Sequence, residues 1–177
     1  MRAVIAEPLL PLAAPIDTLT TDPDNANRGD VAAIRKSLNV FGQRKPVVGR
    51  RTGTDADGRP TGIVIAGNHT MLAASELGWD HVAAVFIDDD ASTAKAYALA
   101  DNRTGELSSW DQAQLAEHLR SLQSDNFDIT ELGWTDAELA RLLGAEVDLS
   151  AFKAYDETIA AGVKMTECPA CGHEWAT

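Results

Sequence analysis

The sequence contains little cysteine, few aromatic residues and no long apolar run. Only two of its 177 residues are cysteines, and both lie in the last ten positions, which excludes a secreted disulfide framework. No apolar run approaches the roughly 20 residues that cross a bilayer, and the apolar residues of 3–14 are interrupted by Glu7, Pro8 and Pro11. We therefore expect a cytoplasmic protein without a membrane partner.

Positive charge is also scarce, because 15 Lys and Arg face 27 Asp and Glu, a net charge of −12. An evenly acidic surface would repel nucleic acid. The charge is uneven, however, because residues 28–51 contain a single acid, Asp30, beside seven cations: Arg28, Arg35, Lys36, Arg44, Lys45, Arg50 and Arg51. This basic segment is either a patch that meets phosphates or DNA or a solvated surface that keeps the protein soluble.

The remaining composition is globular, with 45% hydrophobic and 24% charged residues, and the length suits one medium domain with an appendage. Apolar spacing predicts a helix over 31–41, with Asp30 as its N-cap and Gly42 as its end. The other expected elements are strands within 14–19, 46–50, 61–65 and 81–87, a hairpin loop over 52–60, helices over 70–77, 92–102 and 111–122, and a capping box from Thr135 to Glu138. This order of strands and helices predicts a small α/β (α+β) domain.

The most informative stretch is 63–79, where an apolar strand passes through Gly67, Asn68, His69 and Thr70 directly into a helix. Unpaired N–H groups at a helix N-terminus attract anions, so this turn is a candidate phosphate cradle. Alternatively, Gly67 only makes a tight turn and Asn68 or Thr70 caps the helix. His69 is the candidate catalytic residue because imidazole exchanges protons near neutrality; a simple hydrogen-bonding role is the alternative.

The chain ends in a Cys-x-x-Cys motif, Cys168 to Cys171, followed by His173. This motif resembles one half of a zinc ribbon, in which two thiolates of one turn bind a tetrahedral Zn²⁺. His173 is a candidate third ligand, although it lies very close to Cys171. A second copy of the chain can complete a four-cysteine site across a homodimer. The alternatives are a metal-free remnant and a redox pair.

Five short motifs, taken in order, resemble those of the ParB/sulfiredoxin superfamily. They are Ile-Asp-Thr-Leu at 16–19, Asn-Arg at 27–28, Phe-Gly-Gln-Arg-Lys-Pro-Val-Val at 41–48, Ile-Ala-Gly-Asn-His-Thr at 65–70 and Leu-Gly-Trp at 77–79. With Ala-Leu-Ala-Asp-Asn-Arg-Thr at 98–104, the pattern is similar to the ParB-like (ParB-like nuclease) domains of bacteriophages and of DNA methyltransferase neighbourhoods. The resemblance implies a small mixed sheet with helices over residues 1–104, followed by an acidic helical extension over 105–145 and a tail over 146–177.

The resemblance also implies a site for a nucleoside triphosphate, CTP or ATP, with Mg²⁺. Residue by residue, it makes Gly67, Asn68, His69 and Thr70 the phosphate turn. Gln43, Lys45 and Pro46 would lie beside this turn, and Arg28 would reach into it.

Chromosome-partitioning members of the superfamily have an acidic residue and arginines after the glycine, where this chain has Asn68, His69 and Thr70. That difference disfavours nucleotide hydrolysis. Residues 105–143 contain only two cations, Arg120 and Arg141, and no evident helix-turn-helix, which disfavours sequence-specific DNA recognition. The acids of 88–90 fit a solvated strand end better than a metal site.

We therefore expect a nucleotide-binding, DNA-associated module, encoded by a phage or linked to DNA methylation or partition. This module would contact DNA through the basic segment of residues 28–51. The alternatives are an enzyme on the same scaffold, acting in nucleotide hydrolysis, phosphotransfer or DNA cleavage, and an adaptor that binds no ligand.

Overall fold

The computed structural model describes residues 3–144, 165–167 and 169–176. It divides into two compact units, Met1–Leu143 and Gly144–Thr177. Within the described ranges, no helix is both long enough and apolar enough to span a bilayer.

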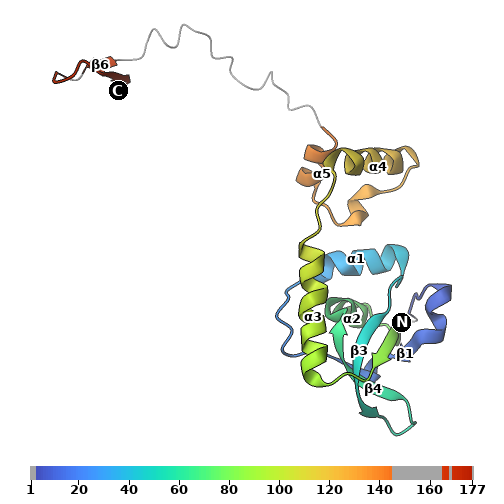
Figure 1. The fold of residues 1–177 in the computed structure, drawn as a ribbon. Helices are drawn as coiled ribbons and strands as arrows, with labels where there is room; N and C mark the ends of the chain where they lie inside the picture. Colours follow the sequence, from blue (N-terminus) through green and yellow to red (C-terminus); the bar gives the residue numbers. More distant parts are fainter. Residues whose placement is uncertain (1–2, 145–164, 168, 177) are drawn as a thin grey trace. The chain divides into compact units, whose positions relative to one another are not determined.

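The first unit is built on a curled five-stranded sheet, which confirms the expected mixed α/β class (Figure 1). Strands β3 (Val47–Thr54) and β4 (Pro60–Ala66) form an antiparallel hairpin at the centre. Strand β5 (His81–Ile87) pairs parallel with β3, and β2 (Leu19–Thr21) pairs parallel with β4. Strand β1 (Ala13–Pro15) completes the order β1-β5-β3-β4-β2 by pairing antiparallel with β5.

The stretch 14–19, expected to be a short strand or the end of one, contains the end of β1 and the start of β2, which are the two outer strands of the sheet. A 3-10 turn, η2 (Ile16–Thr18), separates β1 from β2, and the Thr18 hydroxyl donates to the Pro15 carbonyl at 2.7 Å. A further 3-10 helix, η1 (Glu7–Leu12), precedes β1. The expected loop over 52–60 is shorter than predicted: both strands continue into it, and Asp55 closes the turn by accepting N–H bonds from Asp57 and Arg59 at 2.9 Å.

Three helices accompany this sheet: α1 (Val31–Phe41), α2 (Asn68–Glu76) and α3 (Ala91–Glu106). Helix α1 has the predicted ends, because Asp30 accepts from the Ala33 N–H at 3.0 Å and Gly42, at φ +67°, stops it. Helices α1 and α2 pack together, and α3 runs along β4 (Figure 1). The core is formed by buried apolar residues of the sheet, of α1 and α2, and of the turn after α2: Leu19, Leu38, Val47, Val64, Met71, Ala73, Ala74, Trp79, Val82 and Ala84.

The acidic extension is helical, with α4 (Gln112–Ser124), the 3-10 turn η3 (Ile129–Leu132) and α5 (Asp136–Leu142). The predicted capping box between Thr135 and Glu138 is present at the start of α5. The extension has a small core of its own: Leu115, Leu119, Ile129 and Leu139. The Phe127 ring stacks on Phe41 of α1, with centroids 5.9 Å apart. Helix α3 continues to Glu106, past the domain boundary expected after residue 104.

The second unit contains a two-stranded antiparallel hairpin of β6 (Met165–Glu167) and β7 (Glu174–Ala176). Cys168 lies outside the described residues, so the predicted zinc ligand set stays a prediction. Cys171 is exposed with a free thiol, and the His173 ring stacks on Trp175 at 6.4 Å between centroids.

Candidate functional site

The turn between β4 and α2 leaves backbone donors open at the helix N-terminus. Gly67 adopts φ +93°, and a Cβ at this position would lie 2.7 Å from Cγ1 of Val47, so the turn needs glycine. The first helical bond runs from the Met71 N–H to the Gly67 carbonyl at 3.0 Å, and no side chain caps the helix. Within the described chain, the N–H groups of residues 68–70 therefore have no partner. The alternative in which Asn68 or Thr70 caps the helix is wrong.

Asn68 instead joins two strands. Its side chain is buried, its amide nitrogen donates to the Val64 carbonyl at 3.1 Å, and its Oδ1 accepts from the Asp22 N–H at 2.8 Å. Val64 belongs to β4, and Asp22 directly follows β2. Asn68 thus ties the end of β2 to the phosphate turn, and its backbone N–H is the group left for a ligand.

His69 contacts the segment that leads from β2 to α1. Its Nε2 accepts the Gly29 N–H at 2.9 Å, and a Cβ on Gly29 would lie only 2.8 Å from its Nδ1. An imidazole that accepts at Nε2 is neutral and carries its proton on Nδ1. The acceptor nitrogen that a general base would use is therefore already engaged.

Residues 22–29 form what we call the strap, which crosses from the end of β2 toward α1. Asn27 donates from its side-chain amide to Oδ1 of Asn102 on α3, and Asn102 donates to the Ala98 carbonyl at 2.7 Å. The Arg28 guanidinium bonds to the backbone carbonyls of Asn25 and Asn27. The strap is thus held by side chains of both α2 and α3.

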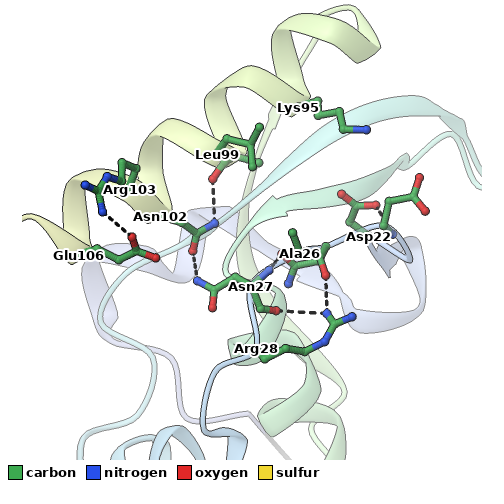
Figure 2. A pocket seen from close by; sticks show the side chains of 12 residues that line it. Asp22, Ala26, Asn27, Arg28, Lys95, Leu99, Asn102, Arg103 and Glu106 are labelled. Atoms are coloured by element: carbon green, nitrogen blue, oxygen red, sulfur yellow. Dashed lines mark hydrogen bonds and ion pairs between the residues drawn. The ribbon is translucent and has the colours of Figure 1, made fainter.

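Two adjoining cavities lie between the strap and the helices. The smaller, about 150 Å³, covers the phosphate turn and reaches Asp101 and Asn102 of α3. The larger, about 580 Å³, separates the strap from α3, and Asn25 and Asn102 line both. Figure 2 shows the α3 side chains on one side of the larger cavity and Ala26, Asn27 and Arg28 on the other. Its charged lining residues are Asp22, Asp24, Arg28, Lys95, Arg103 and Glu106.

The cations of the larger cavity differ in their partners. Arg103 is paired with Glu106 at 2.9 Å. Lys95 has no ion pair or hydrogen bond in the described part of the chain, and Arg28 bonds only to backbone carbonyls. Lys95 and Arg28 therefore keep their positive charge available for a ligand.

The structure brings together only part of the predicted site. Gly67, the three residues after it and Arg28 line the two cavities, whereas Gln43, Lys45 and Pro46 line neither. Gln43 is buried, and its amide bonds to the backbone of Ala83 and to the Lys45 carbonyl at 3.1 Å. In this structure Gln43 supports the sheet, and whether any of these three residues touches a ligand stays a prediction.

Sequence reasoning missed Lys95 as a site residue. Its signal was helical spacing, because five further residues that line the larger cavity follow it at helical intervals along α3: Ala98, Leu99, Asn102, Arg103 and Glu106.

The basic segment of residues 28–51 is divided among several elements. Arg35 of α1 pairs with Glu76 at 2.8 Å, and Arg51 of β3 pairs with Asp88 at 2.8 Å. Asp88 thus has a cation partner, and Asp90 caps α3 by accepting from Ser92 and Thr93. Among the described residues, no group of three or more His, Cys, Asp or Glu side chains is arranged to hold a metal ion.

Comparisons with known proteins match this chain by structure alone, because no protein-family model and no curated protein matches its sequence. The C-terminally truncated chromosome-partitioning protein ParB from Caulobacter crescentus, complexed with CTP-γ-S, superposes with a TM-score of 0.61 at 17% identity, over 84% of this chain and 81% of that chain. The same protein complexed to the centromeric parS site gives a TM-score of 0.42 at 15% identity, over 84% of this chain and 87% of that one. Sulfiredoxin from Arabidopsis thaliana gives 0.35 at 18% identity, over 49% of this chain and 93% of that one.

Of these three matches, that to the CTP-γ-S complex supports an argument, and at 17% identity it concerns the fold alone. The motifs cover residues 15–104, about half of the chain, so a likeness over 84% extends beyond them. The chain therefore shares the fold of this truncated chromosome-partitioning protein.

Proposed function

We propose that this chain is a nucleotide-binding, DNA-associated module of ParB type that holds a nucleoside triphosphate at the N-terminus of α2. One observation carries the proposal: the unpartnered N–H groups of residues 68–70 face a cavity system that also contains Arg28 and Lys95. Backbone donors, the helix dipole and nearby cations together make a phosphate site.

The sizes of the two cavities suit the two ends of a nucleotide. The smaller cavity, at about 150 Å³, has room for phosphate groups beside the turn. The larger, at about 580 Å³, lies within the range of small-molecule sites and offers apolar contact for a base from Ala26, Ala98 and Leu99. The fold relative crystallised with CTP-γ-S supports this class of ligand.

The carboxylates of Asp22 and Asp24 line the larger cavity beside these cations. Mg²⁺ is commonly held by one or two carboxylates together with substrate phosphates, so a Mg²⁺ carried by the triphosphate fits here. It would offset repulsion between the phosphates and the two acids. The proposed activity is binding, since the acceptor nitrogen of His69 is engaged by Gly29.

DNA association rests on the basic segment and on the ParB resemblance. Five of its seven cations form no ion pair among the described residues: Arg28, Lys36, Arg44, Lys45 and Arg50. We propose that DNA contacts come from this group, and that the module is encoded by a phage or acts beside DNA methylation or partition.

Calorimetric titration with CTP, ATP and GTP, with and without Mg²⁺ and duplex DNA, tests the proposal. Lys95→Ala is expected to weaken nucleotide binding about tenfold, the effect of removing one charge-assisted hydrogen bond. Arg141→Ala removes a positive charge from α5, outside both cavities and outside the basic segment, and is expected to leave affinity unchanged. Lys45→Ala tests the arrangement expected from sequence. Absence of binding to all three nucleotides overturns the proposal. A loss confined to Lys45→Ala would favour the arrangement expected from sequence, with Lys45 at the phosphates.

A further inference from the structure

We propose that His69 is a positioning residue of the nucleotide site, whose neutral imidazole fastens the strap through Gly29. In this role it neither donates to phosphate as a charged group nor acts as a base. The effect on nucleotide affinity rests on the proposed function above, whereas the fastening of the strap does not.

The strap is fixed at three points by side chains of the helices beside it. The Asp22 N–H donates to Asn68 at 2.8 Å, and the Gly29 N–H donates to His69 Nε2 at 2.9 Å. Between these points, Asn27 donates to Asn102. Two consecutive residues at the start of α2 thus hold the two ends of the strap, so its path is tied to the turn that presents the free N–H groups.

His69 and Gly29 are in close contact as well as hydrogen-bonded. A Cβ on Gly29 would approach Nδ1 to 2.8 Å and Cγ to 3.0 Å, so any other residue at 29 would push the ring away. Arg28 comes directly before Gly29, and its guanidinium bonds to strap carbonyls. The position of Arg28 in the larger cavity therefore depends on the bond between Gly29 and His69.

The fastening bond requires a neutral ring. A protonated imidazole carries hydrogen on both nitrogens and cannot accept the Gly29 N–H. Arg28 and Asp30 flank Gly29 in the sequence, and Asp101 of α3 and Ile34 of α1 line the same cavity as His69.

Two substitutions of His69 separate the roles. His69→Ala removes the acceptor and is expected to weaken nucleotide binding about three- to tenfold, the effect of one hydrogen bond. His69→Gln keeps an acceptor oxygen at similar reach, does not titrate, and is expected to restore most of the affinity.

A substitution on the strap side completes the test. Gly29→Ala displaces the ring without altering α2, so it should weaken binding in the wild type but add little in the His69→Ala background. Additive losses would mean that the two residues act independently and would overturn the proposal.

Amide exchange at Gly29, measured by NMR without nucleotide, tests the fastening by itself. We expect His69→Ala to accelerate exchange and His69→Gln to keep it slow. Equal exchange in the wild type and His69→Ala overturns the inference. If exchange behaves as expected but no variant binds a nucleotide, the fastening is supported and the proposed function fails. If His69→Gln protects Gly29 but binds nucleotide as weakly as His69→Ala, the imidazole itself contacts the ligand and the proposal is wrong.

Discussion

The side-chain amide of Gln43 forms two hydrogen bonds with the backbone of Ala83. Its Oε1 accepts from the Ala83 N–H at 2.6 Å, and its Nε2 donates to the Ala83 carbonyl at 2.9 Å. Both residues are buried, with exposed fractions of 1% and 0%. Gln43 lies shortly before β3, and Ala83 lies in β5, which pairs with β3. The side-chain amide thus satisfies the N–H and the carbonyl of Ala83 in β5, as a peptide group of a neighbouring strand would.

Replacing Gln43 by alanine should destabilise the protein by about 2–4 kcal/mol, because the Ala83 N–H and carbonyl are left buried without partners. Urea unfolding measures the change. Gln123→Ala, at an exposed position of α4, is the matched control and should change stability by less than about 0.5 kcal/mol. Equal stability of the two variants would show that the Gln43 amide is not needed by the sheet.

Gly67→Ala should cost about 1–3 kcal/mol, because it combines a strained left-handed residue with a clash against Val47. Gly58→Ala provides a comparison at φ +78° with open space around the Cβ. It therefore measures only the free-energy cost of placing alanine in a left-handed backbone conformation. We expect Gly67→Ala to be the more destabilising of the two in thermal or urea unfolding. The reverse order would mean that the turn relaxes away from Val47 at little cost.

Acid should weaken the N-terminus of α3 through Asp90. The Thr93 hydroxyl, at 2.7 Å, and the backbone N–H groups of Thr93 and Ser92 hold the pKa of Asp90 below its ordinary value of 3.8. A lowered folded-state pKa stabilises the protein above the unfolded pKa, and that stabilisation is lost as the pH falls through the folded pKa.

Asp90→Asn keeps a capping side chain but does not titrate, so it isolates this effect. The stability of the wild type relative to Asp90→Asn should be constant above about pH 5 and decline as the pH falls below 3.8, measured by urea unfolding at several pH values. Other carboxylates contribute equally to both proteins and cancel. A difference that does not change with pH would contradict the capping role of the ionised Asp90.

The C-terminal motif is expected to bind zinc between two copies of the chain. Four thiolates from two Cys168 and Cys171 pairs would hold one Zn²⁺ per two chains. Elemental analysis of the purified protein, combined with its mass in solution, measures both quantities. The double variant Cys168→Ala, Cys171→Ala should bind no zinc. If zinc holds the two copies together, this variant should also be monomeric. Absence of metal from the wild type would end this hypothesis.

The sequence predicted those parts of the fold that depend on neighbours along the chain. The N-cap at Asp30, the stop at Gly42 and the capping box at Thr135 each involve residues within a few positions, so local patterns reveal them. The turn at Gly67 was found for the same reason, because a strand, a glycine and a helix follow one another directly.

Long-range placement was not accessible in the same way. No local pattern shows that β1 and β2, separated by three residues, lie at opposite edges of the sheet. Nor does the sequence show that the Gln43 side chain bonds to Ala83, 40 positions away, or that Lys95 faces the strap. These features depend on tertiary packing, which decides between local alternatives that have similar intrinsic preferences.

The parallel pairing of β2 with β4 separates the framework of this protein from the part that we propose binds a ligand. Because the two strands run in the same direction, the strap and the turn at Gly67 both begin at the same end of the sheet, where β2 and β4 end. The register between β2 and β4 is fixed by buried residues such as Leu19 and Val64, none of which belongs to the strap. Under the proposed function, changes in the length or composition of residues 23–28 would therefore alter the ligand contacts while the strands stay in place. Such an arrangement would let one scaffold acquire new binding preferences through substitutions, insertions or deletions in a single short segment.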